Sequence, residues 1–256
     1  MKSLINLIIY VYNNEKEIKE IIENGKKLTD QIIIIDLQSK DQTVKIAQKL
    51  GAKVYLYSHP EYVELAREWG IKKAESEWVF ILDADEKISK ELVKEIKLVL
   101  HPKDKNANSH FYVPRKNIFI DRWLKHGGWW PDYQIRLINT HYFVSWPKKI
   151  HSTPIIKGKK GYLKNPLLHY FHSNLEAMVK KTIKFENIEA DLLLQADKEA
   201  NVLIFFRKFF GEIWRRMFKN LGFLDGRWGI IESIYQSFSK TITYLFLYEK
   251  KYIFKK

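Results

Sequence analysis

The sequence contains no cysteine, and none of its apolar runs is long. The missing thiols exclude a disulfide framework, thiolate metal sites and a cysteine nucleophile. The longest apolar runs, such as Val202–Phe206, fall well short of the ~20 residues that a membrane-spanning helix needs. No small-residue cleavage site follows the first apolar run, so a signal peptide is not indicated. We therefore expect a cytoplasmic protein that does not cross a membrane.

Two phosphate-binding signatures are also missing. No G-x-G-x-x-G follows the first apolar run, and no G-x-x-x-x-G-K-[ST] occurs in the sequence. Dinucleotide-binding and P-loop functions lose their main support without these glycine patterns. If the protein binds a nucleotide, carboxylates with a divalent metal ion are the obvious substitute for a glycine-rich cradle.

The chain does have an excess of positive charge, which is unevenly distributed. Its 256 residues carry a formal net charge of +14, and 46% of them are hydrophobic, enough for a substantial core. Residues 1–100 hold 16 basic and 17 acidic residues, whereas residues 101–256 hold 28 and 13. The basicity therefore belongs to the second part, where it suits a polyanionic partner such as nucleic acid, an anionic membrane or a phosphorylated substrate.

The first hundred residues alternate between strand and helix patterns. Short apolar runs predict parallel strands at Leu7–Val11, Ile32–Ile35, Val54–Tyr57 and Trp78–Leu82. Helical patterns between them cover Glu15–Leu28, Thr43–Leu50 and Glu64–Ala74. This order predicts an α/β fold with a Rossmann-like, mostly parallel sheet flanked by helices.

The pattern changes twice further along the chain. We expect residues 1–100 to form one half of the α/β domain and residues 101–174 the other half, with strands at Phe111–Val113 and Gln134–Ile138. Residues 175–256 are mostly helical in pattern and form a basic C-terminal extension.

Acidic residues follow two of the predicted strands, at the sheet edge where α/β proteins bind ligands. Asp83-Ala84-Asp85 comes directly after the fourth strand, and Asp36 ends the second. Both Asp83 and Asp85 could bind Mg²⁺ or Mn²⁺ that neutralises a diphosphate leaving group, or they could only cap the following helix. Asp36 could accept hydrogen bonds from a base or ribose, or simply form a turn.

Six motifs occur in a fixed order along the chain. They are Tyr12-Asn13, Asp36 with Ser39-x-Asp41-x-Thr43, Arg67, Asp83-Ala84-Asp85-Glu86, Trp130-Pro131-Asp132-x-Gln134-x-Arg136-Leu137, and Gly222-Phe223-Leu224-Asp225-Gly226 with Gly229. Taken together, they resemble family 2 inverting glycosyltransferases of the GT-A fold. The similarity is closer to the branch that includes the lipopolysaccharide-core β-1,4-glucosyltransferases, and it covers nearly the whole chain.

The resemblance implies a UDP-hexose donor, with glucose as the expected sugar, and a lipopolysaccharide-type or other cell-envelope glycan or glycolipid acceptor. It assigns residues 1–100 as the nucleotide-sugar-binding half and residues 101–174 as the acceptor-binding half of the GT-A domain. It implies donor contacts from Tyr12, Asn13, Asp36, Arg67, Asp83 and Ala84. It also implies a metal ion, Mg²⁺ or Mn²⁺, held by Asp83 and Asp85, with His151 as a further candidate ligand. A lone histidine is more often structural than a ligand, and His169, in an aromatic segment, is interpreted as structural.

An inverting transfer needs a base that removes the acceptor proton. We assign this role to Asp132, which follows a loop with two glycines and two tryptophans; Glu86, beside the metal motif, is the competitor. Without a catalytic role, Asp132 would pair with Arg136 or Arg115. The predicted acceptor-binding residues are Trp129, Trp130, Gln134 and Arg136.

The chain departs from the family pattern at four positions. Tyr10 stands where a proline is usual, Asn14 where a glutamate is usual, Glu68 where an asparagine is usual, and Ser152 where a glutamate follows the histidine. Because of these departures, a second interpretation stays open: the protein could bind sugars with the same fold but be catalytically inactive.

The segment Val202–Leu221 predicts an amphipathic helix with aromatic residues on one half and arginines and lysines on the other. Such a helix could lie on the inner face of the cytoplasmic membrane, or pack its apolar half on the catalytic domain. Nucleic-acid binding by the basic aromatic tail is a further alternative, but no nucleic-acid module accompanies it, so we expect no nucleic-acid partner. We favour an anionic membrane surface.

Overall fold

The computed structural model describes residues 4–100, 108–172 and 175–253. The chain divides into two compact units. The first comprises Met1–Arg115 and Tyr133–His169, and the second Lys116–Asp132 and Tyr170–Lys256. Each unit is therefore assembled from two separate stretches of the chain.

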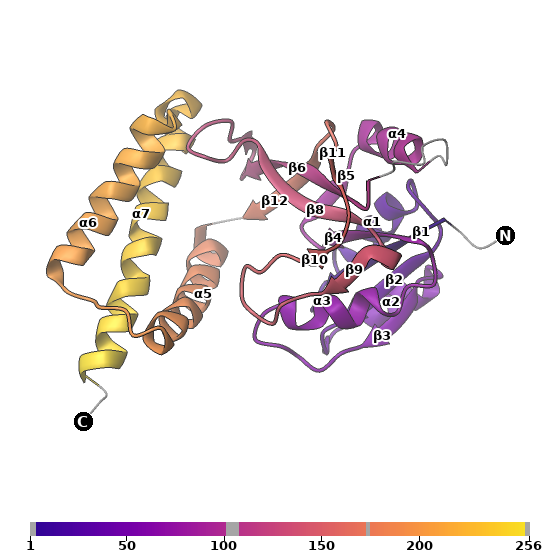
Figure 1. Ribbon diagram of the computed structural model, residues 1–256, viewed down its shortest axis with the longest axis horizontal. Helices are drawn as coiled ribbons and strands as arrows, with labels where there is room; N and C mark the ends of the chain where they lie inside the picture. Colours follow the sequence, from indigo (N-terminus) through magenta and orange to yellow (C-terminus); the bar gives the residue numbers. More distant parts are fainter. Residues whose placement is uncertain (1–3, 101–107, 173–174, 254–256) are drawn as a thin grey trace. The chain divides into compact units, whose positions relative to one another are not determined.

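The first unit is built on a curved sheet (Figure 1). Its helices and the 3₁₀ turn are α1 (Ile18–Gly25), α2 (Thr43–Lys49), α3 (Glu64–Ile71), α4 (Lys90–Val99) and Thr140–Tyr142. Its strands are β1 (Ile5–Val11), β2 (Ile32–Asp36), β3 (Lys53–Leu56), β4 (Trp78–Asp83), β5 (Glu86–Ile88), β6 (His110–Phe119), β8 (Asp132–Asn139), β9 (Phe143–Ser145), β10 (Ile155–Ile156), β11 (Lys160–Tyr162) and β12 (Leu167–His172), of which β6, β8 and β12 continue into the second unit.

The strand order of the main sheet is β3-β2-β1-β4-β8-β6-β12-β5. The pairs β2–β3, β1–β2 and β1–β4 are parallel, whereas β4–β8 and β5–β12 are antiparallel. The run of parallel strands β3-β2-β1-β4 corresponds to the four strands predicted from the sequence, which confirms the expected α/β class. Its carboxyl ends bring Val11, Asp36 and Asp83 to one edge of the sheet.

Helices cover both faces of the parallel strands because successive β1 residues point to opposite sides. Leu7 and Ile9 pack in a core with residues of α1, α2 and α4, whereas Ile8 and Tyr10 pack with residues of α3. All residues of β1 and β2 are buried, as expected for strands covered on both faces. The two layers fix the sheet edge from which the polar side chains project.

The second unit combines a short hairpin strand with helices (Figure 1). Strand β7 (Arg122–Trp123) pairs with the end of β6, and α7 (Gly226–Tyr248) packs against both α5 (Leu175–Gln195) and α6 (Val202–Ile213). The predicted helix over Val202–Leu221 is present but changes form, because α6 ends at Ile213 and continues as a π-helical segment, Trp214–Lys219. A 3₁₀ turn, Gly222–Asp225, then leads into α7, and a π-helical turn, Glu249–Ile253, follows it.

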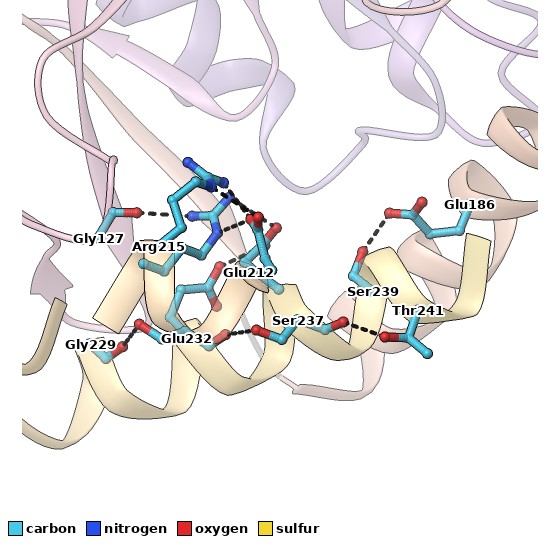
Figure 2. A network of polar contacts seen from close by, with 12 residues as sticks. Gly127, Glu186, Glu212, Arg215, Gly229, Glu232, Ser237, Ser239 and Thr241 are labelled. Atoms are coloured by element: carbon cyan, nitrogen blue, oxygen red, sulfur yellow. Dashed lines mark hydrogen bonds and ion pairs between the residues drawn. The ribbon is translucent and has the colours of Figure 1, made fainter. Parts of the chain in front are cut away.

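Helix α7 buries polar side chains and exposes apolar ones. Its buried face carries Glu232, Ser233, Ser237, Ser239 and Thr243. Ser239 and Thr243 both donate to the Glu186 carboxylate of α5, as Figure 2 shows for Ser239. Its exposed large apolar residues are Ile230, Ile231, Ile234, Phe238, Leu245 and Tyr248. A helix on a water-soluble domain usually buries its apolar side chains, whereas α7 buries these polar ones together with Leu247 and leaves several apolar ones exposed.

Candidate active site

Two loops at the carboxyl edge of the sheet are tied together by side-chain hydrogen bonds. Asn13, at a positive φ of 53°, donates its backbone N–H to Ser39 Oγ at 2.9 Å, and its Oδ1 accepts from Lys40 N at 2.8 Å. Asp36 Oδ2 accepts from Ser39 N at 3.0 Å. These hydrogen bonds join the loops after β1 and β2 and bring Asn13 and Asp36, which are predicted to bind the donor, together.

One oxygen of the Asp36 carboxylate accepts no hydrogen bond from the described residues. The residue is 1% exposed, and Oδ1 has no hydrogen-bond partner within the described part of the chain. A buried carboxylate oxygen left without a donor is costly, so it is suited to accept a hydrogen bond from a ligand. Beside it, the half-exposed ring of Tyr12 lies against His59, with the ring centroids 4.3 Å apart.

Asp83 is held by two arginines. Arg67 Nη2 donates to Oδ1 at 2.6 Å, and Arg136 Nη2 donates to Oδ2 at 2.7 Å. Burial by itself would raise the pKa of Asp83, but the charges of Arg136 and Arg67 and their hydrogen bonds hold it well below its usual value. Asp83 is therefore an anion at neutral pH with both oxygens already engaged.

Glu86 completes this charged cluster. It is 1% exposed, its Oε1 accepts from Arg136 Nη2 at 2.5 Å, and its Oε2 accepts from Asp83 N at 3.0 Å. Arg136 itself is 5% exposed and links the two acids across β8 and β4. In this structure Arg136 holds the turn between Asp83 and Glu86 in place, and its predicted contact with an acceptor stays a prediction. Gln134, also predicted there, is half-buried on β8.

Asp85 points into a different environment from Asp83. Its side chain is 36% exposed, and His169 Nε2 of β12 lies 3.5 Å from its Oδ2. His151, the predicted ligand, is exposed in a loop, where its backbone N–H donates to Glu64 Oε1 at 2.9 Å. Over residues 4–100, 108–172 and 175–253, no three acidic or histidine side chains form a group able to hold a metal ion, so Asp83, Asp85 and His151 do not converge. Asp85 and His169 are the pair that the fold brings together.

Asp132 belongs to the second unit and is oriented by a buried asparagine. Asn117 is fully buried, and its Nδ2 donates to Asp132 Oδ2 at 3.0 Å and to the Trp129 carbonyl at 3.2 Å. Asp132 is half-buried and follows a cis Trp130–Pro131 peptide bond. Asn117 therefore holds the Asp132 carboxylate in one orientation.

The two predicted acceptor tryptophans have different surroundings. The Trp129 ring stacks on Phe171 at 5.0 Å in a small apolar cluster. Trp130 meets Trp123 edge-on at 5.3 Å, and the ammonium groups of Lys116 and Lys125 lie 4.4 and 4.8 Å from the Trp123 ring centre. Trp123 and Trp130 are thus the half-exposed aromatic pair beside two cations.

The sequence model of the family described as "Glycosyl transferase family 2" matches residues 6–160, which include Asp36, Asp83, Asp85 and Asp132. The chain belongs to glycosyl transferase family 2. Curated relatives support this: an uncharacterized glycosyltransferase of Rickettsia conorii is 28% identical, with 92% of this chain and 86% of the relative covered. One of Rickettsia typhi is 29% identical over 92% and 84% of the two chains.

Solved structures share the fold of this glycosyltransferase. A mannosyltransferase from Pyrobaculum calidifontis in complex with GDP-Man and Mn²⁺ superposes with a TM-score of 0.53 at 11% identity, covering 93% of this chain and 75% of the other. TarS 1–349 of S. aureus in complex with UDP-GlcNAc superposes with a TM-score of 0.50 at 17% identity, covering 94% and 81%. At these identities the likeness shows the GT-A fold, as the sequence motifs indicated.

The four departures from the family pattern all have local contacts in this glycosyltransferase. Tyr10 Oη donates to the Arg67 carbonyl at 2.9 Å, and Asn14 Oδ1 accepts from Tyr12 N at 3.0 Å. Glu68 Oε2 accepts from Trp146 N at 3.1 Å, and Ser152 Oγ donates to the Pro147 carbonyl at 2.6 Å. These residues support the backbone around the site.

Sequence reasoning missed Asn117 and interpreted His169 as structural. Both lie on strands whose neighbours are distant in the sequence: β6 carries Asn117, and β12 pairs with β5, placing His169 opposite Glu86. The alternation of β12 residues could have indicated which of them face the acid motif, but the pairing partner of β12 could not be known from the pattern.

Proposed function

We propose that this glycosyltransferase transfers a hexose, glucose, from a UDP-sugar to an acceptor with inversion at the anomeric carbon. The acceptor is a glycan or glycolipid of the cell envelope, of the lipopolysaccharide type. The observation that carries the proposal is the arrangement of acids at the carboxyl edge of the sheet: Asp36 with a spare buried oxygen, Asp83 as a fixed anion and Asp85 exposed beside it. Sheets of this class bind nucleotides at this edge.

The loop residues support a donor site for the nucleoside. Asp36 Oδ1 would accept a hydrogen bond from the uracil or ribose, and the half-exposed Tyr12 ring offers a stacking face. Arg67 is buried, and its Nε and Nη1 have no hydrogen-bond partner within the described chain. These two nitrogens could donate hydrogen bonds to the nucleotide sugar while Nη2 keeps its contact with Asp83. Ala84, between the two acids, is half-buried and packs against the core, and its contact with the donor stays a prediction.

The residues present fit a Mg²⁺ or Mn²⁺ ion completed by the substrate. Asp85 would hold the ion through its partly exposed carboxylate, with His169 Nε2 as a nitrogen ligand, and diphosphate oxygens would supply further ligands. Such an ion, when bound, offsets the negative charge of the leaving diphosphate. Asp83 contributes a fixed negative charge and is not assigned as a ligand, because two arginines occupy its oxygens.

Asp132 is the residue best suited to act as the base. Glu86, its competitor, is buried and accepts hydrogen bonds on both oxygens, so it has no route to an acceptor hydroxyl. Asn117 donates to Asp132 and so fixes the orientation of the carboxylate, as a base requires. The acceptor oxygen would lose its proton to Asp132 and attack the anomeric carbon from the face opposite UDP.

The surroundings of Trp123 and Trp130 support an anionic carbohydrate acceptor. A half-exposed aromatic pair can stack on a sugar ring, and Lys116 and Lys125 beside it can pair with a phosphate or carboxylate. A phosphorylated, lipid-linked glycan has both features.

The exposed apolar face of the second unit supports peripheral membrane binding. Phe206, Phe210, Trp214 and Phe218 on α6 and its π-helical continuation are each more than half exposed. Arginines and lysines of the same helices flank them, as at Arg207, Arg215 and Lys219. A large exposed apolar patch with cations marks a surface that binds lipid headgroups and acyl chains. Among the described residues, no helix is both long enough and apolar enough to cross a bilayer.

A thermal-shift screen of UDP- and GDP-sugars with and without Mn²⁺ tests the donor, and UDP release tests the chemistry. We expect a metal-dependent rise in Tm with one UDP-hexose, and loss of transfer in Asp85→Ala and Asp132→Asn. Wild-type rates in both variants would contradict the mechanism. No shift with any nucleotide sugar would favour an inactive sugar-binding protein, and salt-sensitive gel-shift binding without turnover would favour nucleic-acid binding.

A further inference from the structure

The loop that leads to Asp132 has little structure of its own. We call residues 124–131, between β7 and β8, the aromatic loop. It contains Gly127 and Gly128, both at positive φ, 67° and 87°. Adjacent glycines in this region give a chain the most freedom it can have, so such a loop needs outside contacts to hold one conformation.

Asp225, in the turn before α7, supplies three of these contacts. Its Oδ2 accepts from Lys125 N at 2.9 Å and from His126 N at 2.8 Å, and its Oδ1 lies 2.8 Å from His126 Nδ1. The Asp225 side chain is 7% exposed, so water competes little for these bonds. Asp225 stands at the N-cap position of α7, yet its side chain makes no cap hydrogen bond. The Asp225 carboxylate therefore accepts hydrogen bonds from the aromatic loop and does not cap α7.

The π-helical segment and Asn220, which follows it, supply further contacts. Arg216 Nη1 donates to the Gly127 carbonyl at 3.1 Å, and its guanidinium lies 5.3 Å from the centre of the Trp129 ring. Gly127 N donates to the Asn220 carbonyl at 2.8 Å. Glu212 holds Arg216 in turn, with Arg216 Nε 2.7 Å from Oε1. Figure 2 shows Gly127 at the end of this network, beside Glu212 and Arg215.

The glycines of the C-terminal motif make this arrangement possible. A Cβ on Gly222 would lie 2.8 Å from the Arg216 carbonyl oxygen, and one on Gly229 would lie 1.9 Å from the Gly222 carbonyl oxygen. Glycine at 222 therefore lets the 3₁₀ turn approach the π-helical segment, and glycine at 229 lets α7 approach the 3₁₀ turn. Gly226, at φ 65°, turns the chain directly after Asp225.

We propose that the motif Gly222-Phe223-Leu224-Asp225-Gly226 and Arg216 form a clamp that positions the aromatic loop, and through it Asp132, for proton abstraction. Asp225 and Arg216 are positioning residues in this proposal, which rests on the proposed role of Asp132. The clamp holds the Lys125–Gly127 end of the loop, while Asn117 holds the Trp129–Asp132 end. A base displaced by about 1 Å can lose on the order of a hundredfold in rate, so fixing both ends matters for turnover.

Hydrogen–deuterium exchange on the full-length protein tests the clamp without any substrate. In Asp225→Ala, peptides covering residues 124–128 should exchange at least tenfold faster than in the wild type, because Lys125 N and His126 N lose their acceptor. Peptides of β1 and β4 should exchange as before. Asp225→Asn keeps an oxygen that can accept both N–H groups and should restore most of the protection. Asp121→Ala removes an exposed carboxylate from the same hairpin and should change nothing.

The catalytic consequence is read from UDP release with UDP-glucose, Mn²⁺ and water as acceptor. We expect Asp225→Ala and Arg216→Ala to keep the wild-type thermal shift with UDP-glucose and Mn²⁺ but to lose at least tenfold in turnover. Unchanged exchange of residues 124–128 in Asp225→Ala would overturn the clamp. If that variant does not fold, wild-type exchange at residues 124–128 in Arg216→Ala overturns it equally.

Failure of the clamp and failure of the proposed function give different results. If the wild-type protein neither shifts with UDP-glucose nor releases UDP, the proposed donor chemistry is wrong, while the exchange data still decide whether the clamp exists. If the wild type turns over and Asp225→Ala shows faster exchange at the loop with undiminished turnover, the clamp does not position the base and the proposal is wrong.

Discussion

Arg136 Nη2 donates to Asp83 Oδ2 at 2.7 Å across two antiparallel strands. The same guanidinium donates to Glu86, so one buried arginine balances two acids of the motif. Removing it would leave both carboxylates in a buried site with one partner fewer, which is far more costly than losing an exposed ion pair.

Arg136→Met should therefore lower the free energy of unfolding by about 3–5 kcal/mol, measured by urea denaturation at pH 7. Lys87→Met is the matched control, because Lys87 pairs with Glu20 on the surface, and it should cost less than about 1 kcal/mol. Equal losses in the two variants would mean that Arg136 is not the balancing charge of the motif.

Metal binding should depend on Asp85 and His169 and not on His151. With UDP and Mn²⁺ present, Asp85→Ala should abolish the metal-dependent rise in Tm, and His169→Ala should reduce it, because these groups lie 3.5 Å apart. His151→Ala, in the exposed loop, is the control and should keep the full rise. A loss in His151→Ala with no loss in His169→Ala would reverse the assignment.

Glu232 should make the stability of the protein depend on pH. Burial raises its pKa to about 7, against the opposing hydrogen bond from Gln236 and the charge of Arg216, and its Oε2 has no partner in the described chain. The folded state therefore holds the proton up to about pH 7, whereas the unfolded chain releases it near its ordinary value of 4.5. Stability from this group is full below pH 4.5 and is lost as the pH rises through 7.

Glu232→Gln removes the ionisation but keeps a group that Gln236 can contact. At pH 8 we expect the free energy of unfolding of the variant to be about 1–3 kcal/mol higher than that of the wild type. At pH 5 the two free energies of unfolding should differ little. Denaturant unfolding at both pH values measures this. Glu176→Gln, at an exposed position on α5, should show no such dependence. A gain that is the same at both pH values would exclude ionisation as the cause.

Membrane binding should depend on the apolar residues of the second unit. Phe210→Ser, Trp214→Ser and Phe218→Ser combined should reduce co-sedimentation with phosphatidylglycerol vesicles at least tenfold, since these side chains are each more than half exposed. Leu56→Ser with Leu98→Ser removes similarly exposed apolar residues from the first unit and is the control. Wild-type sedimentation of the triple variant would contradict the membrane proposal.

The strands of the parallel half were predictable because burial on both faces leaves a continuous apolar run. The predicted Ile32–Ile35 and Trp78–Leu82 differ from β2 and β4 by one terminal residue, an aspartate in each case. The antiparallel half was harder: Phe111–Val113 is only part of β6, whose run is interrupted by Pro114 and charged residues. Polar residues on a half-covered strand mask its length.

The tail shows a different limit. A wheel of Val202–Leu221 predicts the amphipathic character, but it cannot say whether the apolar half is covered, and the structure leaves much of it exposed. The change to a π-helix at Trp214 was also unpredictable, since a wheel assumes one turn angle throughout.

The sequence alone determined the α/β class, the acidic edge of the sheet and the family, because strand burial and short motifs are local properties of the chain. Only the tertiary structure decided the partners of those acids. Asp83 pairs with Arg67 and Arg136, Asp85 meets His169, and Asp225 reaches the loop before Asp132. These contacts join residues far apart in the chain, and strand pairing and helix packing, which no local pattern encodes, bring them together.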